Sequence, residues 1–149
     1  MKKNLFVLIL LCVISVINVN AGVNPAMRKE YDFTSFNAVR TVSRRQSLSG
    51  RGTYVTSSYK ISLVKSDHYK VVMEVWDRDD IDLFEVRRVG NTVELVTAIK
   101  KYPSHSKAED PCATVTIYTP EFPSVTLSGT SQMSVSGGAF SGDNLSVTL

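Results

Sequence analysis

Residues 113–149 decide the fold predicted for this chain, and they read ATVTIYTPEFPSVTLSGTSQMSVSGGAFSGDNLSVTL. Apolar residues alternate with Ser or Thr in short runs, and glycine-containing turns separate several of these runs. Such a period of two is typical of short β-strands. The four residues Ser124 to Leu127 recur identically as Ser146 to Leu149, at an offset of 22 residues. A repeat of this length favours one turn of a solenoid.

The predicted fold is therefore all-β, with a hairpin-rich head at 22–112 that leads into the first rungs of a parallel β-helix (solenoid) at 113–149; the family resemblance given below implies that this helix is right-handed. In such a solenoid, inward side chains stack on their counterparts in the next rung. We expect Val125 to stack on Val147, and Leu127 on Leu149. About three rungs are needed for a stable array, and the chain supplies little more than one. We therefore expect either a truncated solenoid or self-association through an open edge at Leu149. The alternative is a chance recurrence in a tail rich in Ser, Thr and Val.

The first 21 residues have the features of a secretory signal peptide. A basic start is followed by an apolar run from Leu5 to Ile17, and small residues precede a predicted cleavage between Ala21 and Gly22. The apolar run of 13 residues is short against the roughly 20 that a spanning helix needs. We therefore expect an exported protein, located in the periplasm, on the outer-membrane surface or outside the cell, that does not span a membrane after cleavage.

Charge and cysteine content narrow the classes of function. The chain has 17 Lys and Arg and 14 Asp and Glu residues, and the leader takes away Lys2 and Lys3, so the net charge falls to about +1. This balance argues against a nucleic-acid-binding protein, which usually has a basic excess. Cleavage also removes Cys12 and leaves Cys112 alone, so no internal disulfide is expected.

The 22–112 segment contains several predicted β elements. A first strand is expected over Tyr31 to Val39. Alternating residues on both sides of a turn at 65–68 predict a hairpin that spans Tyr59 to Val75. Gly90-Asn91 predicts the turn of a second hairpin from Glu85 to Val96. The segment from Lys100 to Pro111 is expected to be a loop.

Two charged clusters are candidate functional features. Arg40, Arg44, Arg45 and Arg51 fall within twelve residues that contain no acid, and they form a candidate patch for anionic glycans or lipid head groups; the alternative is a solvated loop. The segment from Asp77 to Asp82 holds four carboxylates. Its spacing does not match a calcium-binding loop, so we expect one aspartate to cap a short helical turn from Ile81 to Phe84. We predict no metal site, cofactor or catalytic residue.

The order of motifs resembles the auto-transporter adhesin, head GIN domain family. The residues that carry the resemblance are Phe33-x-x-Phe36, the Tyr59–Val75 region, GNTVEL at 90–95, VTIYTP at 115–120 and VTLSG at 125–129. The resemblance implies a secreted or envelope protein of Gram-negative bacteria with a right-handed β-helical fold. That family has no agreed catalytic residues to transfer to this chain.

The predicted function is a non-enzymatic adhesin or binding module for a glycan, a matrix protein or an envelope component. A polysaccharide-active lyase or hydrolase is the first alternative, because parallel β-helices also host such enzymes. Only Glu121 and Asp143 are charged after residue 112, however, which disfavours a catalytic face on the predicted rungs. A purely structural envelope protein is the second alternative.

Overall fold

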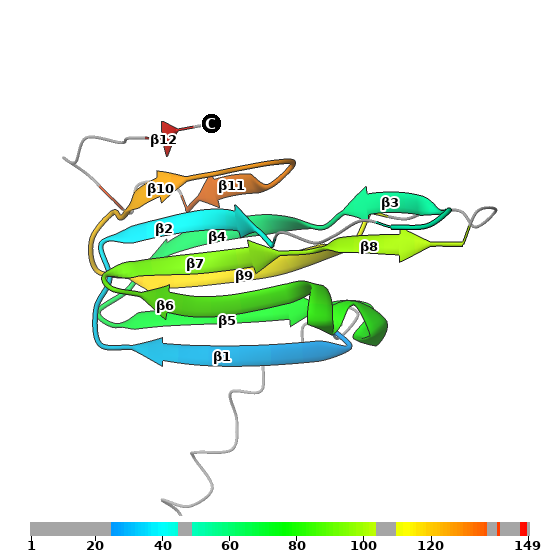
Figure 1. Cartoon of the computed structure of the whole chain (residues 1–149). Helices are drawn as coiled ribbons and strands as arrows, with labels where there is room; N and C mark the ends of the chain where they lie inside the picture. Colours follow the sequence, from blue (N-terminus) through cyan, green and yellow to red (C-terminus); the bar gives the residue numbers. More distant parts are fainter. Residues whose placement is uncertain (1–24, 45–48, 104–109, 137–139, 141–146, 149) are drawn as a thin grey trace, which may run out of the picture.

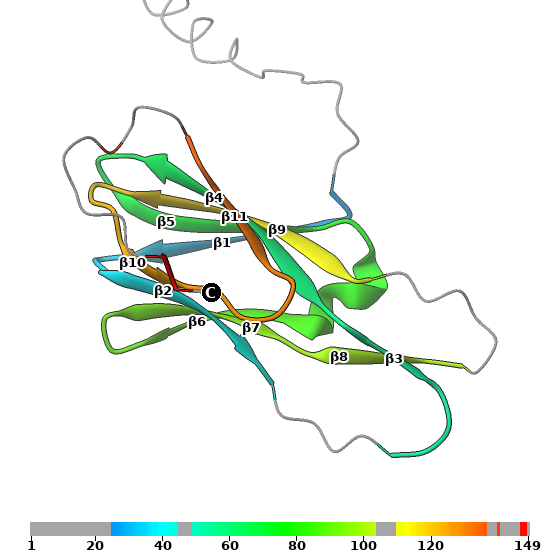
Figure 2. The same ribbon diagram turned by 90° about the horizontal axis from the view of Figure 1, so that it is seen from above.

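Two five-stranded sheets lie face to face, and a two-stranded ribbon extends from one end of them (Figures 1 and 2). This arrangement comes from a computed structural model that describes residues 25–44, 49–103, 110–136, 140 and 147–148. The predicted cleavage site at Ala21 and Gly22 lies outside the described residues, as do Arg45 and Leu149.

Sheet A has the strand order β1-β5-β9-β4-β11. Its strands are β1 (Met27–Phe33), β5 (Tyr69–Val75), β9 (Cys112–Thr119), β4 (Ser58–Lys65) and β11 (Gln132–Val135). The β1–β5 and β5–β9 pairs are antiparallel, whereas β9–β4 and β4–β11 are parallel. Sheet A is therefore a mixed sheet.

Sheet B has the order β12-β10-β2-β7-β6. Its strands are β12 (Val147–Thr148), β10 (Ser124–Thr126), β2 (Ala38–Ser43), β7 (Thr92–Thr97) and β6 (Phe84–Val89). All its pairs are parallel except the antiparallel β6–β7 pair. The ribbon pairs β3 (Thr53–Thr56) with β8 (Ile99–Tyr102) in antiparallel register, and η1 (Arg78–Leu83) is a 3-10 helix between β5 and β6.

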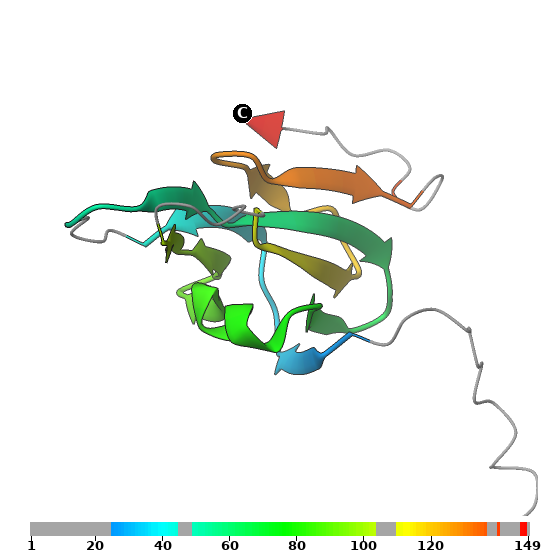
Figure 3. The ribbon, with the colours of Figure 1, turned by 90° about the vertical axis from the view of Figure 1, so that its right-hand side faces the viewer.

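The buried core residues lie between the two sheets, which Figure 3 shows in a view along the strands. Period-two alternation turns one side of each strand inward. Val115 at the centre of β9 is fully buried, and its register partners are Ile61 of β4 and Met73 of β5. Val39, Val93 and Leu95 face them from sheet B. The prediction of an all-β chain agrees with this architecture.

The predicted parallel β-helix is wrong. A solenoid needs successive rungs that run in the same direction, but β1, β5 and β9 pair antiparallel and so do β6 and β7. The described sheets are mixed and lie opposite each other as open layers. Tight turns after Lys65 and Val89 reverse the chain and prevent it from coiling in one direction.

The predicted hairpin from Tyr59 to Val75 is also wrong in its pairing. Both strands form, but β9 lies between β4 and β5 and bonds to each. β9, which begins almost forty residues after the end of β5, pairs with one edge of β4 and one edge of β5. We attribute this pairing to its continuous row of apolar side chains, which is buried in the core. The second hairpin is confirmed as β6–β7, with Gly90 at φ 61° in its turn.

The predicted first strand over Tyr31 to Val39 is divided in two. β1 ends at Phe33 in sheet A and β2 begins at Ala38 in sheet B. Phe36 lies in the connection and is buried. Its spacing of three residues from Phe33 breaks the period of two at the place where the chain changes sheets.

The C-terminal stretch contributes to both sheets. Val125 and Leu127 are buried in the shared core. β12 pairs with β10 in parallel, so Val147 lies beside Val125 in register. The central position of β9 in sheet A shows that residues after 112 complete the same core as those before it.

Candidate binding site

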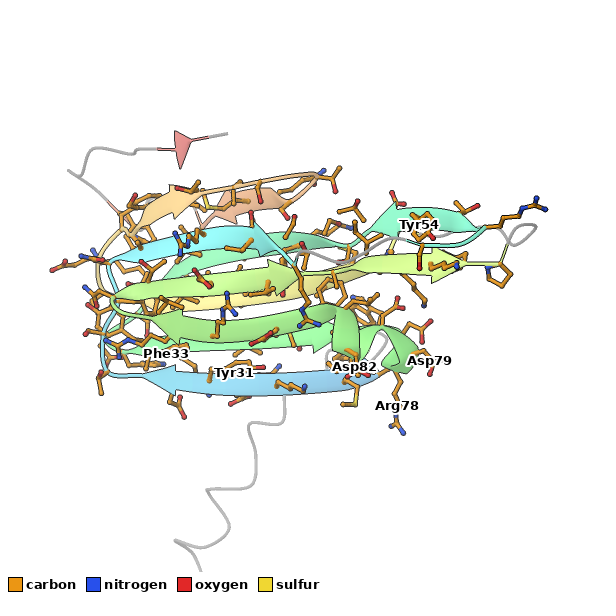
Figure 4. The ribbon with its side chains drawn as sticks, viewed as in Figure 1. Tyr31, Phe33, Tyr54, Arg78, Asp79 and Asp82 are labelled. Atoms are coloured by element: carbon orange, nitrogen blue, oxygen red, sulfur yellow. The ribbon has the colours of Figure 1, made fainter. Side chains whose placement is uncertain are left out.

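A cavity of about 350 Å³ lies at the end of the two sheets where η1 meets the ribbon. We call it the Trp76 pocket. Its lining comes from the end of β5, from η1, from β8 and from the start of β9, and consists of Trp76, Asp77, Asp80, Lys100, Tyr102, Asp110, Pro111 and Cys112. Figure 4 shows the labelled Arg78, Asp79 and Asp82 of η1 at the end of the molecule from which the ribbon with Tyr54 extends. The volume is at the lower end of the range for small-ligand sites.

Trp76 is the one tryptophan in the chain, and half of its surface (50%) is exposed. It follows Val75, the last residue of β5, which is 1% exposed. Alternation along the strand therefore turns Trp76 away from the core. A large aromatic side chain left exposed beside a cavity offers an apolar plane to a ligand.

The short helix η1 supplies two aspartates to the pocket. Asp77 is the N-cap, and its Oδ1 accepts a hydrogen bond from the backbone N–H of Asp79 at 3.0 Å. The predicted capped helical turn is thus confirmed, although η1 covers Arg78–Leu83. Capping fixes the start of the helix and thereby directs the next turn, which carries Asp80, toward β8.

Asp80 and Lys100 join η1 to the ribbon. The Lys100 ammonium donates to Oδ1 of Asp80, which is 8% exposed, and lies 5.2 Å from the ring centroid of Tyr102. The hydrogen bond to Asp80 raises the pKa of Lys100, against the opposing effect of burial. Lys100 is the one cation among the described lining residues, and the neighbouring Asp80 carboxylate compensates its charge.

The lining as a whole is acidic. Among the described lining residues, Asp77, Asp80 and Asp110 contribute three negative charges and Lys100 one positive charge, which gives these residues a formal charge of −2. Cys112 is half-buried as the first residue of β9. Among the described residues, no group of three His, Cys, Asp or Glu side chains is placed to hold a metal ion. The pocket can stack a ring on Trp76 and accept hydrogen bonds from a donor-rich ligand.

The structure distributes the predicted arginine patch over two places. Arg40 and Arg44 lie on the outer side of sheet B, where Arg40 pairs with Glu94 and Arg44 pairs with Glu85 at 3.0 Å. Arg51 precedes β3 at the far end of the ribbon. Each of the two arginines near β2 thus already has a carboxylate partner.

A second groove of about 350 Å³ crosses β4, β9 and β11. Its polar lining includes Lys60, Ser62, Thr114, Gln132 and Ser134, and the hydroxyl oxygens of Ser62 and Ser134 are 3.2 Å apart. The groove has no aromatic side chain in its lining. The Trp76 pocket is therefore the stronger candidate.

Sequence reasoning did not find the pocket. The position of Trp76 directly after a buried strand residue is a usable signal of exposure. No local sequence pattern predicts that β8 and Asp110 lie beside Trp76, because both belong to segments further along the chain.

The described helical residues give no segment long and apolar enough to cross a membrane.

The fold is similar to that of a protein from Bacteroides fragilis NCTC 9343 described as a "putative adhesin". The two are 18% identical, the match covers 85% of this chain and 51% of that one, and the TM-score is 0.51. A Parabacteroides merdae ATCC 43184 "putative adhesin" matches at 11% identity over 76% of this chain and 40% of its own, with a TM-score of 0.45. A "putative lipid binding protein" from Parabacteroides distasonis ATCC 8503 is 13% identical to this chain. The match covers 76% of this chain and 41% of that one, with a TM-score of 0.45.

This chain spans about half of the length of the Bacteroides fragilis protein and less of the other two. At 18% identity the similarity to the Bacteroides fragilis protein concerns the fold. No protein-family model and no curated protein matches the sequence, so the resemblance to the head GIN domain family stays a prediction.

Proposed function

We propose that this chain is an exported, non-enzymatic binding protein that holds a carbohydrate ligand in the Trp76 pocket. The observation that carries the proposal is the half-exposed Trp76 at a cavity that carboxylates also line. The predicted leader supports export. The fold shared with a Bacteroides fragilis "putative adhesin" supports a role in binding at the cell envelope.

The chemistry of the lining suits a sugar. One face of a pyranose ring carries C–H groups, and an aromatic plane with its negative π-face attracts such a surface. The hydroxyl groups at the edge of the sugar ring donate hydrogen bonds, and each ionised carboxylate can accept several of them through its two oxygens. Trp76 and the neighbouring aspartates supply both kinds of contact within one cavity.

The engagement of the aspartates favours binding over hydrolysis. Glycoside hydrolysis needs two carboxyl groups across a cleft, one as the acid and the other as a nucleophile or base. In this pocket Asp77 caps η1 and Asp80 pairs with Lys100. Two of the three lining carboxylates thus hold the local structure together.

A glycan array probed with the purified protein tests the proposal. We expect binding to at least one class of glycan, and we expect Trp76→Ala to weaken that binding about tenfold or more, since the stacking plane is lost. The matched control is Val89→Ala, which truncates another exposed apolar side chain (46% exposed) in the β6–β7 hairpin. A protein that binds no glycan, or a W76A variant that binds as tightly as the wild type, would refute the carbohydrate site. Release of new reducing ends from a bound glycan would instead favour the enzyme alternative.

A further inference from the structure

We propose that the carbohydrate recognised at the Trp76 pocket is an amino sugar, and that its protonated primary amine is the group that the pocket selects. This inference rests on the proposed function, because it names the class of sugar for the same site. Three features of the pocket support it: its charge, the way it already holds one ammonium group, and the exposure of the groups at its opening.

The charge of the described residues at the pocket disfavours an acidic sugar and favours a cationic one. The lining residues that the structure describes have a formal charge of −2. The remaining charged residues of η1 are Arg78, Asp79 and Asp82, and they bring the formal total to −3. A uronic acid or sulfated sugar would add another negative charge to this field, whereas an ammonium group would be attracted.

The pocket already holds one ammonium group of its own. The Lys100 ammonium contacts the Asp80 carboxylate and lies 5.2 Å from the centroid of the Tyr102 ring. A carboxylate together with an aromatic face is an effective receptor for a cation, because the ring quadrupole adds to the charge pair. The bond with Asp80 also neutralises Lys100, so this lysine does not repel a second ammonium as a lone cation would.

At the opening of the pocket, carboxylates again lie beside an aromatic side chain. Trp76, Asp77 and Asp110 are exposed, and the indole ring is the strongest cation–π partner among the aromatic side chains. The capping bond of Asp77 uses one of its two carboxylate oxygens. An amino sugar stacked on Trp76 would therefore meet carboxylates beside an aromatic plane, as the Lys100 ammonium does.

The experiment uses Trp76 itself as the reporter, because its fluorescence is that of the sole tryptophan. The protein is titrated with tetra-glucosamine, with its N-acetylated tetramer and with a galacturonate tetramer, at neutral pH and low salt. We expect tetra-glucosamine to bind about tenfold more tightly than the acetylated form, and we expect the galacturonate to bind more weakly than either. The preference for the amine should shrink with added salt, since exposed charges are screened.

A pair of variants locates the selectivity. Asp110→Asn should lower the affinity for tetra-glucosamine about three- to tenfold and lower the affinity for the acetylated tetramer clearly less, because that sugar loses only a hydroxyl contact and no charge pair. Asp67→Asn is the matched control, because it removes an exposed carboxylate from the turn between β4 and β5, and we expect it to leave both affinities unchanged. If D110N lowered both affinities equally, Asp110 would not be selecting the amine, and the inference would be contradicted.

The outcomes separate the two proposals. Equal or tighter binding of the acetylated tetramer would overturn the amino-sugar inference and leave the carbohydrate site standing. An absence of binding to all three sugars and on the glycan array would refute both. Trilysine serves as a further arm: if it bound as tightly as tetra-glucosamine, the pocket would select an amine regardless of the sugar, and the inference would also fail.

Discussion

Arg87 donates its Nε hydrogen to Oε2 of Glu94 over 2.6 Å, from the position directly opposite on the antiparallel neighbour strand. Arg40 lies opposite Glu94 on the parallel side and donates its own Nε hydrogen to Oε1 over 2.8 Å. The two arginines cover Glu94, which is only 2% exposed although it lies on the outer side of sheet B. Burial of a carboxylate costs free energy unless hydrogen-bond partners compensate its charge, so the folded state depends on both arginines.

Glu94→Gln should lower the free energy of unfolding by roughly 1–2 kcal/mol at pH 7, because the amide has one acceptor oxygen in place of two, so that one of the two arginines faces an NH2 group instead of an acceptor. Urea denaturation measures this loss. Glu30→Gln is the control: Glu30 pairs with Arg28 and Lys70 on the exposed outer side of sheet A, and we expect it to change the midpoint little. A midpoint for E94Q equal to that of the wild type would contradict the structural role of this carboxylate.

The same cluster predicts a dependence of stability on pH. The hydrogen bonds from Arg40 and Arg87 lower the pKa of Glu94 below its ordinary value of 4.5. A carboxyl group whose pKa is lower in the folded state stabilises the protein above the unfolded-state pKa and loses that contribution as pH falls through the folded-state pKa. We therefore expect the wild type to lose stability below about pH 4.5, and the acid-dependent loss should be smaller in E94Q. Unfolding midpoints measured from pH 7 to pH 3 would show the difference, and identical slopes would contradict it.

Tyr59 joins the two sheets through its hydroxyl group. Its side chain is fully buried in sheet A, and the hydroxyl donates to the carbonyl oxygens of Val96 at 2.9 Å and Glu85 at 3.2 Å in sheet B. Burial raises the pKa of Tyr59, so the group stays neutral. Tyr59→Phe should lower the free energy of unfolding by about 1–2 kcal/mol, since it leaves buried carbonyl groups without this donor.

Tyr54→Phe is the comparison for Tyr59. The Tyr54 hydroxyl donates to the carbonyl oxygens of Ser49 and Gly50, which precede β3, and these hydrogen bonds are exposed to solvent. Water can replace that donor, so the loss of stability should be smaller than for Y59F. Equal losses of stability in the two variants, measured by thermal unfolding, would contradict the expected larger contribution of the Tyr59 hydroxyl between the sheets.

Two glycines should respond differently to alanine. A methyl group at Gly52 would lie 2.7 Å from the carbonyl oxygen of Tyr102, whereas one at Gly90 would meet nothing within 4 Å. We expect Gly52→Ala to displace β8 and weaken ligand binding at the Trp76 pocket. Gly90→Ala should cost about 1 kcal/mol of stability through its φ of 61° and leave binding intact. Tryptophan fluorescence titration with denaturation of both variants checks these outcomes.

The Asp80–Lys100 pair should behave as a coupled unit. Lys100→Met would leave the Asp80 carboxylate, 8% exposed, without its ammonium partner, and we expect a loss of about 1–3 kcal/mol. Adding Asp80→Asn to that variant should recover part of the loss, because the buried charge is then removed as well. Additive effects in this double-mutant cycle would mean that the two side chains are not coupled.

Local patterns in the sequence predicted those elements whose partners are close in the chain. The Gly90-Asn91 turn specifies the β6–β7 hairpin because positive φ and flanking alternation act within twelve residues. Asp77 caps η1 for the same reason. The alternation of β4 and β5 likewise predicted two strands with one buried side each.

Only the tertiary structure decided how these strands pair and where the Trp76 pocket forms. β9 lies between β4 and β5, because the edge of a strand can pair with any strand whose apolar side chains face the same core. Alternation of apolar and polar residues does not specify the partner strand or its direction. The repeat of Ser-Val-Thr-Leu likewise identified strands but gave the wrong architecture. The Trp76 pocket exists because the ends of β5, β8 and β9 meet at η1, and that meeting depends on the packing of the whole core.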